Sequence, residues 1–201
     1  RDTILNMIVK FIMIIGIPKE IMQGEARVAA TPETVEKFTK AGLTILVESG
    51  AGEKSHYYDI QYEEKGAELI YDPEDLYMRA DLILKVKEPL INENKGKREV
   101  DMMHKGQHLI TFIHPASPVN HDMVRKLANA GVTSLTLDGI PRISRAQNMD
   151  ALTSMSTCAG YKGIIMAAND LTFFMPQMFT AVGMLKPANV LVVGVGVAGL
   201  Q

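Results

Sequence analysis

Three basic side chains of different kinds fall at the ends of expected β-strands: Arg27, Lys87 and His114. Arginine can bind a carboxylate through two parallel hydrogen bonds, lysine can polarise a carbonyl group, and histidine can exchange a proton near neutral pH. Ligands of open α/β sheets bind outside the carboxyl ends of the strands, so these residues could meet in one catalytic cleft. The alternative is structural, because a lysine at a strand end is usually solvated and a histidine before proline often only caps the strand.

Further polar clusters follow the same pattern. Lys19-Glu20 comes after the first expected strand, and Lys85-Val-Lys87-Glu88-Pro89 closes another. A third cluster, residues 142–150, follows the last strand of this region and contains Arg142, Gln147 and Asp150.

A glycine pattern follows the aliphatic run Val190–Val193 and reads Gly194-Val-Gly196-Val-Ala-Gly199. It predicts the strand and turn that open a dinucleotide-binding βαβ unit: Gly194 for the tight turn, Gly196 for close approach of a pyrophosphate, and Gly199 for packing of the next helix. The alternative is a glycine-rich turn after a buried strand. Only two residues follow Gly199, so we expect residues 1–201 alone to bind a dinucleotide weakly or not at all, and to show no turnover.

The elements that must position these residues alternate from Ile14 onwards. Short aliphatic strands are separated by single helices; one helix starts at Thr31-Pro32 and ends before Gly42. Strands are expected at residues 14–17, 43–47, 68–70, 82–87, 108–113 and 132–137. This order predicts an α/β, Rossmann-like (flavodoxin-like), mostly parallel sheet with helices on both faces. Residues 91–106 are polar and are expected to form a surface insertion.

After Asp150 the composition changes to small residues and methionines. We expect two long connecting helices, one up to Leu171 and one from Pro176 to Leu185, followed by the first strand of a second Rossmann domain. At the other end, residues 1–13 are interpreted as an upstream extension, with Met13 as the start of the protein.

Composition narrows the class of protein. Of 201 residues, 47% are hydrophobic and 22% charged, which is typical of a globular core, and the formal net charge of −2 gives no attraction to nucleic acid. The single cysteine, Cys158, excludes an internal disulfide, and its surroundings indicate no metal site. The apolar stretch 163–185 is interrupted by polar residues and proline, so it is not expected to cross a membrane.

Several motifs together resemble a known family. Residues 16–20 (GIPKE), 24–33 (GEARVAATPE), 50–53 (GAGE) and 84–89 (LKVKEP), followed by the final glycine motif, occur in the order found at the start of the alanine dehydrogenase and pyridine-nucleotide transhydrogenase family. The resemblance covers nearly everything from Ile14 onwards. It implies two Rossmann-like domains, residues 14–140 being the first and 187–201 the start of the second, with NAD(H) bound in the cleft by the second.

The resemblance implies two possible activities. Alanine dehydrogenases hold and protonate pyruvate with an Arg, a Lys and a His, which correspond to Arg27, Lys87 and His114. Transhydrogenase alpha subunits carry a loop with Arg, Gln and Asp that positions the nicotinamide of NAD(H) against that of NADP(H). The sequence contains that loop at residues 141–150 (PRISRAQNMD), with Arg142, Gln147 and Asp150 in place, and the matching Ala159-Gly160-Tyr161.

The loop favours the transhydrogenase branch, with residues 141–186 as a nicotinamide-positioning loop and connecting helices. NADP(H) is then expected on a membrane-spanning, NADP-binding partner subunit or domain, and the protein is expected to be a homodimer in the cytoplasm, held at the inner face of the cell membrane by its partners. Retention of Lys87 and His114 keeps NAD-dependent alanine dehydrogenase as the alternative.

Overall fold

The computed structural model describes residues 13–201, so the expected upstream extension lies, except for Met13, outside the described residues. The chain divides into two compact units, residues 1–139 and residues 140–201. Each unit is described below by itself.

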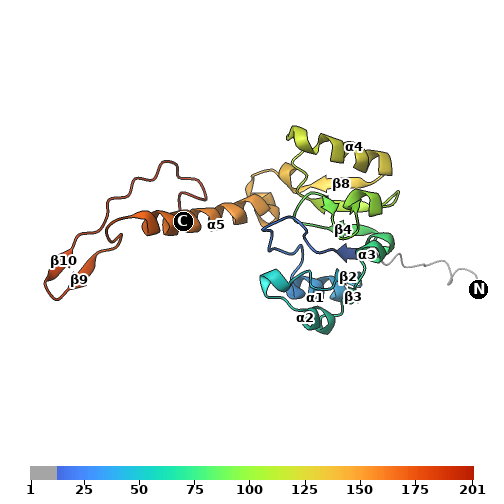
Figure 1. Cartoon of the computed structure of the whole chain (residues 1–201), viewed down its shortest axis with the longest axis horizontal. Coiled ribbons are helices and arrows are strands. Elements are labelled where there is room, and N and C mark those ends of the chain that lie inside the picture. The colour runs from blue at the N-terminus through green and yellow to red at the C-terminus, as the bar shows by residue number, and fades with distance from the viewer. Residues whose placement is uncertain (1–12) are drawn as a thin grey trace, which may run out of the picture. The chain divides into compact units, whose positions relative to one another are not determined.

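The first unit is built on a six-stranded sheet in which every strand pairing is parallel. Its strands are β1 (Ile14–Ile17), β2 (Thr44–Glu48), β3 (Glu68–Ile70), β4 (Leu82–Leu84), β7 (His108–Thr111) and β8 (Thr133–Thr136). Their order is β3-β2-β1-β4-β7-β8, which is the Rossmann order of a doubly wound sheet rather than the flavodoxin-like order (Figure 1). The predicted Rossmann-like, mostly parallel sheet is therefore confirmed.

Helices connect the strands: α1 (Pro32–Lys40), α2 (Asp59–Glu64), α3 (Pro73–Arg79) and α4 (His121–Ala130). The first begins where the sequence predicts, because the Thr31 hydroxyl accepts the Thr34 backbone N–H and Pro32 occupies the first turn. Asp72 caps α3 in the same way, accepting the Glu74 N–H at 2.9 Å. Gly42, after α1, has φ +86°, a conformation that glycine adopts without strain.

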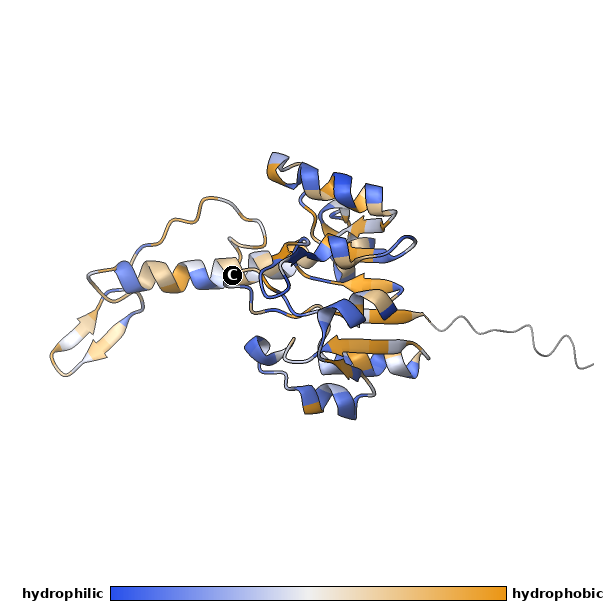
Figure 2. Ribbon diagram, turned by 45° about the vertical axis from the view of Figure 1, so that its right-hand side comes forward, coloured by the Kyte–Doolittle hydropathy of each residue, from blue (hydrophilic) through white to orange (hydrophobic). Residues whose placement is uncertain are grey.

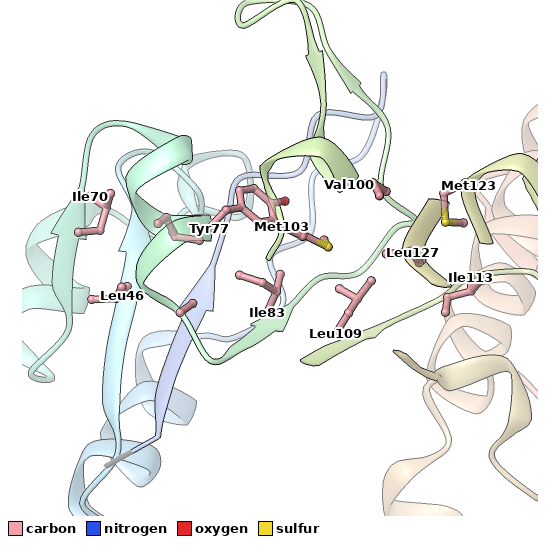
Figure 3. Packing of buried hydrophobic residues seen from close by; sticks show 12 residues of the cluster. Leu46, Ile70, Tyr77, Ile83, Val100, Met103, Leu109, Ile113, Met123 and Leu127 are labelled. Carbon is pink, nitrogen blue, oxygen red and sulfur yellow. The ribbon is translucent and has the colours of Figure 1, made fainter. Parts of the chain in front are cut away.

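Side chains alternate between the two faces of the sheet and form one core on each. On one face, Leu46 of β2, Ile83 of β4 and Leu109 of β7 lie in a row beneath Tyr77 of α3 and Met103, and the cluster continues to Met123 and Leu127 of α4 (Figure 3). The other core joins Ile15, Ile17, Ile45 and Val47 to Val35 of α1 and Tyr62 of α2. Helices therefore cover both faces, as expected. Colouring by hydropathy shows the same division between apolar strands and the polar outer sides of the helices (Figure 2).

The prediction of a surface insertion at residues 91–106 is wrong in part. The segment forms the short hairpin β5 (Ile91–Asn92) and β6 (Lys97–Arg98) and a 3₁₀ turn, η3 (Glu99–Met102). The tip of the hairpin is exposed, but Glu99 is 2% exposed and Val100 and Met103 belong to the core beside α3 and α4. The segment is therefore polar in composition, but the residues at the foot of the hairpin, Glu99, Val100 and Met103, are buried.

The second unit contains α5 (Ala151–Asp170) and an antiparallel hairpin of β9 (Met178–Thr180) and β10 (Gly183–Leu185). The first expected connecting helix is present, but the second, from Pro176 to Leu185, is wrong. The chain turns at Ala181-Val182, and Gly183, the first residue of β10, has φ +134°, a conformation that a helix excludes. The strand expected at Val190–Val193 is also absent from this unit, because these residues pair with no other strand. No helix in residues 13–201 has the length and apolar character needed to cross a bilayer.

Candidate functional site

The carboxyl edge of the sheet carries the polar clusters of the first unit. The strand order reverses between β1 and β4, and such a reversal is where ligands of doubly wound folds bind. Lys19 and Glu20 follow β1, and Lys85 to Lys87 follow β4, so both groups lie at this reversal. A backbone hydrogen bond from Phe112 to Val86 places the residues after β7 next to them.

A buried charge network lies behind this edge. The Lys85 ammonium is 2.8 Å from Oε1 of Glu99 and 3.4 Å from Oε2 of Glu20, and all three side chains are at most 2% exposed. The Tyr77 hydroxyl also donates to Glu99, at 2.8 Å. One lysine thus faces two buried carboxylates, whose charges it must balance.

The network shifts the pKa values of its members. Burial raises the pKa of Glu20 above its usual range, although Lys85 acts against that shift. Burial alone would lower the pKa of Lys85, but the charges of Glu99 and Glu20 outweigh it and raise that pKa. The two carboxylates therefore keep Lys85 charged inside the protein.

The same carboxylates hold the backbone that carries Lys87. Glu20 accepts the N–H groups of Val86 at 2.6 Å and Lys87 at 3.3 Å, and Glu99 accepts the Leu90 N–H at 2.8 Å. Thr111 donates to the Lys87 carbonyl oxygen at 2.8 Å. The segment after β4 is therefore fixed at four points, which makes the backbone position of Lys87 well defined.

Arg27 is engaged by a neighbouring carboxylate. It forms a two-point pair with Glu25, with Nε 2.8 Å and Nη2 2.6 Å from the two carboxylate oxygens. Hydrogen bonds from Arg27 lower the pKa of Glu25 to about 2, and the charge of Lys87 contributes to the shift. Glu25 therefore binds the guanidinium nitrogens with which Arg27 was expected to bind a substrate carboxylate.

His114 is held by a residue from the next strand. Its Nδ1 lies 2.7 Å from Oδ1 of Asp138, which follows β8, and its ring stacks on Phe112 with centroids 5.6 Å apart. The backbone of His114 has φ +48°, a left-handed conformation that is uncommon for residues other than glycine. Burial alone would raise the pKa of Asp138, but hydrogen bonds from Thr136, His114 and Ile113 outweigh it and lower that pKa.

In the second unit, the three residues expected at the nicotinamide lie around a 3₁₀ segment, η6 (Ser144–Met149): Arg142 precedes it, Gln147 is inside it and Asp150 follows it. Asp150 is the N-cap of α5: its carboxylate accepts the Thr153 backbone N–H at 3.1 Å and the Thr153 hydroxyl at 2.6 Å. These bonds, and the charge of Arg142, lower the pKa of Asp150. Arg142 and Gln147 are exposed. Asp150 therefore anchors the segment while the other two present their side chains to solvent.

The glycine motif lines a pocket with one of these residues. Arg142, Thr153 and Ser156 border the pocket together with Gly194, Gly196 and Gly199. Gly194 has φ +109°, and no atom approaches within 4 Å of where a Cβ would stand on Gly194 or Gly196. Open space over these two glycines lets a pyrophosphate approach the backbone, so the residues fit a dinucleotide. Gln147 is not among the residues that line this pocket.

Comparison with known proteins gives the family. Residues 16–159 match the model of the family described as "Alanine dehydrogenase/PNT, N-terminal domain". The chain belongs to the alanine dehydrogenase/PNT family. It is 42% identical over 188 residues to the NAD(P) transhydrogenase subunit alpha of Cereibacter sphaeroides, covering 94% of this chain and 34% of that protein.

The chain is also similar to other members of the alanine dehydrogenase/PNT family. A solved transhydrogenase structure from Sinorhizobium meliloti superposes with a TM-score of 0.83 at 37% identity, over 93% of this chain and 53% of that one. An alanine dehydrogenase from Methanococcus maripaludis is 33% identical, over 93% of this chain and 48% of that protein. The chain thus spans about a third to a half of these relatives.

Two residues that the geometry of this alanine dehydrogenase/PNT domain makes important, Glu99 and Asp138, were not predicted from the sequence. Glu99 was assigned to a polar insertion, and Asp138 was passed over. Asp138 had a usable signal: it follows β8 as His114 follows β7, and ends of adjacent parallel strands meet at one edge. Glu99 had none of this kind, because it reaches the network from outside the sheet.

Proposed function

We propose that this chain is the amino-terminal part of the NAD(H)-binding alpha subunit of a proton-translocating NAD(P) transhydrogenase, which exchanges a hydride between NAD(H) and NADP(H). Its similarity to proteins named as transhydrogenase alpha subunits supports the proposal, because the identity of 42% exceeds the 33% to an alanine dehydrogenase. Those relatives are longer, so the whole activity belongs to the complete protein.

The observation that carries the proposal is the pocket shared by Arg142 and the glycine motif. NAD(H), when bound, supplies or receives the hydride. Gly194, Gly196 and Gly199 would hold its pyrophosphate, while Arg142 and Gln147 would orient the nicotinamide. Asp150 would act by anchoring the segment that bears them, through its bonds to Thr153. Direct exchange between two nicotinamides needs such positioning and no proton donor.

The segments of the chain follow from these roles. In the proposal, residues 14–140 form the family's N-terminal domain, residues 141–186 carry the positioning segment and its connection, and residues 187–201 open the NAD-binding domain. NADP(H) binds a partner subunit or domain that also spans the membrane, which would keep this protein at the inner, cytoplasmic face of the cell membrane.

The alternative is an NAD-dependent alanine dehydrogenase that uses Arg27, Lys87 and His114. The fixed backbone of Lys87 and the contact of His114 with Asp138 favour this alternative. The pairing of the Arg27 guanidinium with Glu25 counts against it.

An assay of the complete protein with both substrate sets separates the two activities. With its NADP-binding partner, the protein should reduce an NAD analogue with NADPH, and His114→Ala should leave that rate largely unchanged. The protein should not reduce NAD when alanine is offered as the electron donor. Robust alanine oxidation in the absence of any NADP-binding partner, abolished by His114→Ala, would overturn the proposal.

We also propose that two copies associate through the β9–β10 hairpin. Phe179 is 79% and Val182 98% exposed, and apolar side chains that lie exposed together on one element mark a surface for association. Sedimentation velocity should show a dimer for the complete protein and a shift towards monomer for Phe179→Ser. An unchanged dimer in that variant would exclude this surface.

A further inference from the structure

The pair of His114 and Asp138 has features that direct hydride exchange does not use. All of its contacts lie within the first unit: Asp138 follows β8, and His114 follows the neighbouring strand β7. The Asp138 carboxylate makes separate contacts through its two oxygens. Oδ1 faces the His114 ring, and Oδ2 faces the backbone.

The backbone contacts decide which way the carboxylate points. Oδ2 accepts the N–H of Ile113 at 3.0 Å, the N–H of His114 at 2.8 Å and the hydroxyl of Thr136. The two backbone N–H groups can only donate, so the atom that faces them must be an acceptor. They also hold His114 in its left-handed conformation, an energetically unfavourable state that persists only where its surroundings impose it.

The ring contact then decides where the imidazole proton lies. An ionised carboxylate only accepts hydrogen bonds, so Nδ1 of His114, at 2.7 Å from Oδ1, must be the protonated nitrogen of the neutral ring. Stacking on Phe112, with an interplanar angle of 10°, fixes the plane of the ring. The other nitrogen, Nε2, then carries a lone pair, and the side chain is 40% exposed.

We propose that Asp138 is a positioning residue that fixes His114 as the Nδ1–H tautomer, and so makes Nε2 a proton-accepting atom at the carboxyl edge of the sheet. A ligand that offers a hydroxyl, an ammonium group or a bound water would meet an acceptor there. This capability is independent of the proposed hydride exchange, which has no proton step.

The substitution Asp138→Asn tests the assignment because its geometry is predictable. The three donors that face Oδ2 require the amide oxygen at that position, so the amide NH₂ must face Nδ1 of His114. An NH₂ group only donates, and Nδ1 must then accept. The proton moves to Nε2, while size and backbone contacts are preserved. The same substitution in a catalytic triad acts by selecting the wrong tautomer.

The measurement is ¹⁵N NMR of the full chain labelled at histidine, at a pH well above the ordinary histidine range. The protein has five histidines, and His114→Gln assigns the signal of His114. In the native protein Nδ1 should have the shift of a protonated ring nitrogen and Nε2 that of an unprotonated one. Asp138→Asn should exchange the two, and Asp138→Glu should restore the native pattern at least in part. The remaining histidine signals report whether the fold is retained.

Chemical reactivity gives a second readout. Diethyl pyrocarbonate modifies an unprotonated imidazole nitrogen, which is Nε2 in the native protein and, in Asp138→Asn, the Nδ1 that accepts from the amide. The modification rate of His114 should fall by up to about tenfold, because freeing Nδ1 breaks its hydrogen bond from the neutral amide, and an ordinary hydrogen bond corresponds to about one such factor. A native His114 protonated at Nε2, or a tautomer unaffected by Asp138→Asn in a folded protein, would overturn the inference.

Discussion

Lys85→Met should lower the free energy of unfolding by about 3–5 kcal/mol, the range found when one partner of a buried ion pair is removed. Methionine fills nearly the same volume as lysine, so the loss comes from charge rather than from a cavity. Without the ammonium, the carboxylates of Glu20 and Glu99 lie buried without a balancing charge. Urea denaturation of the chain measures the difference.

Lys97→Met is the matched control. Lys97 also forms a 2.8 Å ion pair, with Glu74, but its side chain is 51% exposed. Exposed pairs contribute about 0–1 kcal/mol, so this variant should unfold almost as the native protein does. Equal losses in Lys85→Met and Lys97→Met would refute the buried network as a source of stability.

The pH dependence of Lys85→Met gives an independent check. Burial raises the pKa of Glu20 and Lys85 acts against it, so removing Lys85 raises that pKa further. A carboxyl group with a raised pKa stabilises the fold below its unfolded pKa, and that contribution is lost as the pH rises through the folded pKa. The deficit of the variant should therefore be smaller in mildly acidic buffer than at neutral pH.

Gln147→Asn in the complete protein should slow hydride exchange by about 100-fold, because a displacement near 1 Å can cost that much in rate. The change withdraws the amide by one methylene and keeps its chemistry. Affinity for NADH should stay nearly constant, since a positioning contact acts mainly in the transition state. Single-turnover kinetics gives the rate of the hydride step, and calorimetry gives the affinity.

Asn148→Ala is the control for that substitution. It removes an exposed amide from the same 3₁₀ segment without touching Arg142, Gln147 or the Asp150 cap. Its rate should match the native one. If Gln147→Asn exchanges hydride as fast as Asn148→Ala does, the proposed role of Gln147 fails.

Local signals in the sequence predicted most of the sheet and its helices. Thr31-Pro32 and Asp72-Pro73 begin helices by capping chemistry that depends only on neighbouring residues. The helix expected from Pro176 to Leu185 was wrong because apolar composition alone does not distinguish a helix from a short hairpin, and Gly183 disfavours a helix there.

The candidate sites were predicted less completely, for a related reason. The types of Arg27 and His114 showed what chemistry each could do, but not which group it meets. The pairing of Arg27 with Glu25, two residues away, could have been anticipated; that of His114 with Asp138 depends on the register of β7 and β8. The burial of Glu99 depends on how η3 packs on α3, which no local pattern reports.

The place of β1 at the centre of the sheet has a consequence for synthesis on the ribosome. β1 can pair with β2, and β2 with β3, once these strands have emerged, but the other edge of β1 stays open until β4 appears, since Ile15 pairs with Leu82. Until then the nascent chain exposes an unpaired, aliphatic strand edge, a template for association with other chains. Closing the sheet also requires a long loop, which makes this pairing slow. β4 and then β7 present the same kind of open edge in turn, so chaperone demand during production should fall only once β8 has left the ribosome.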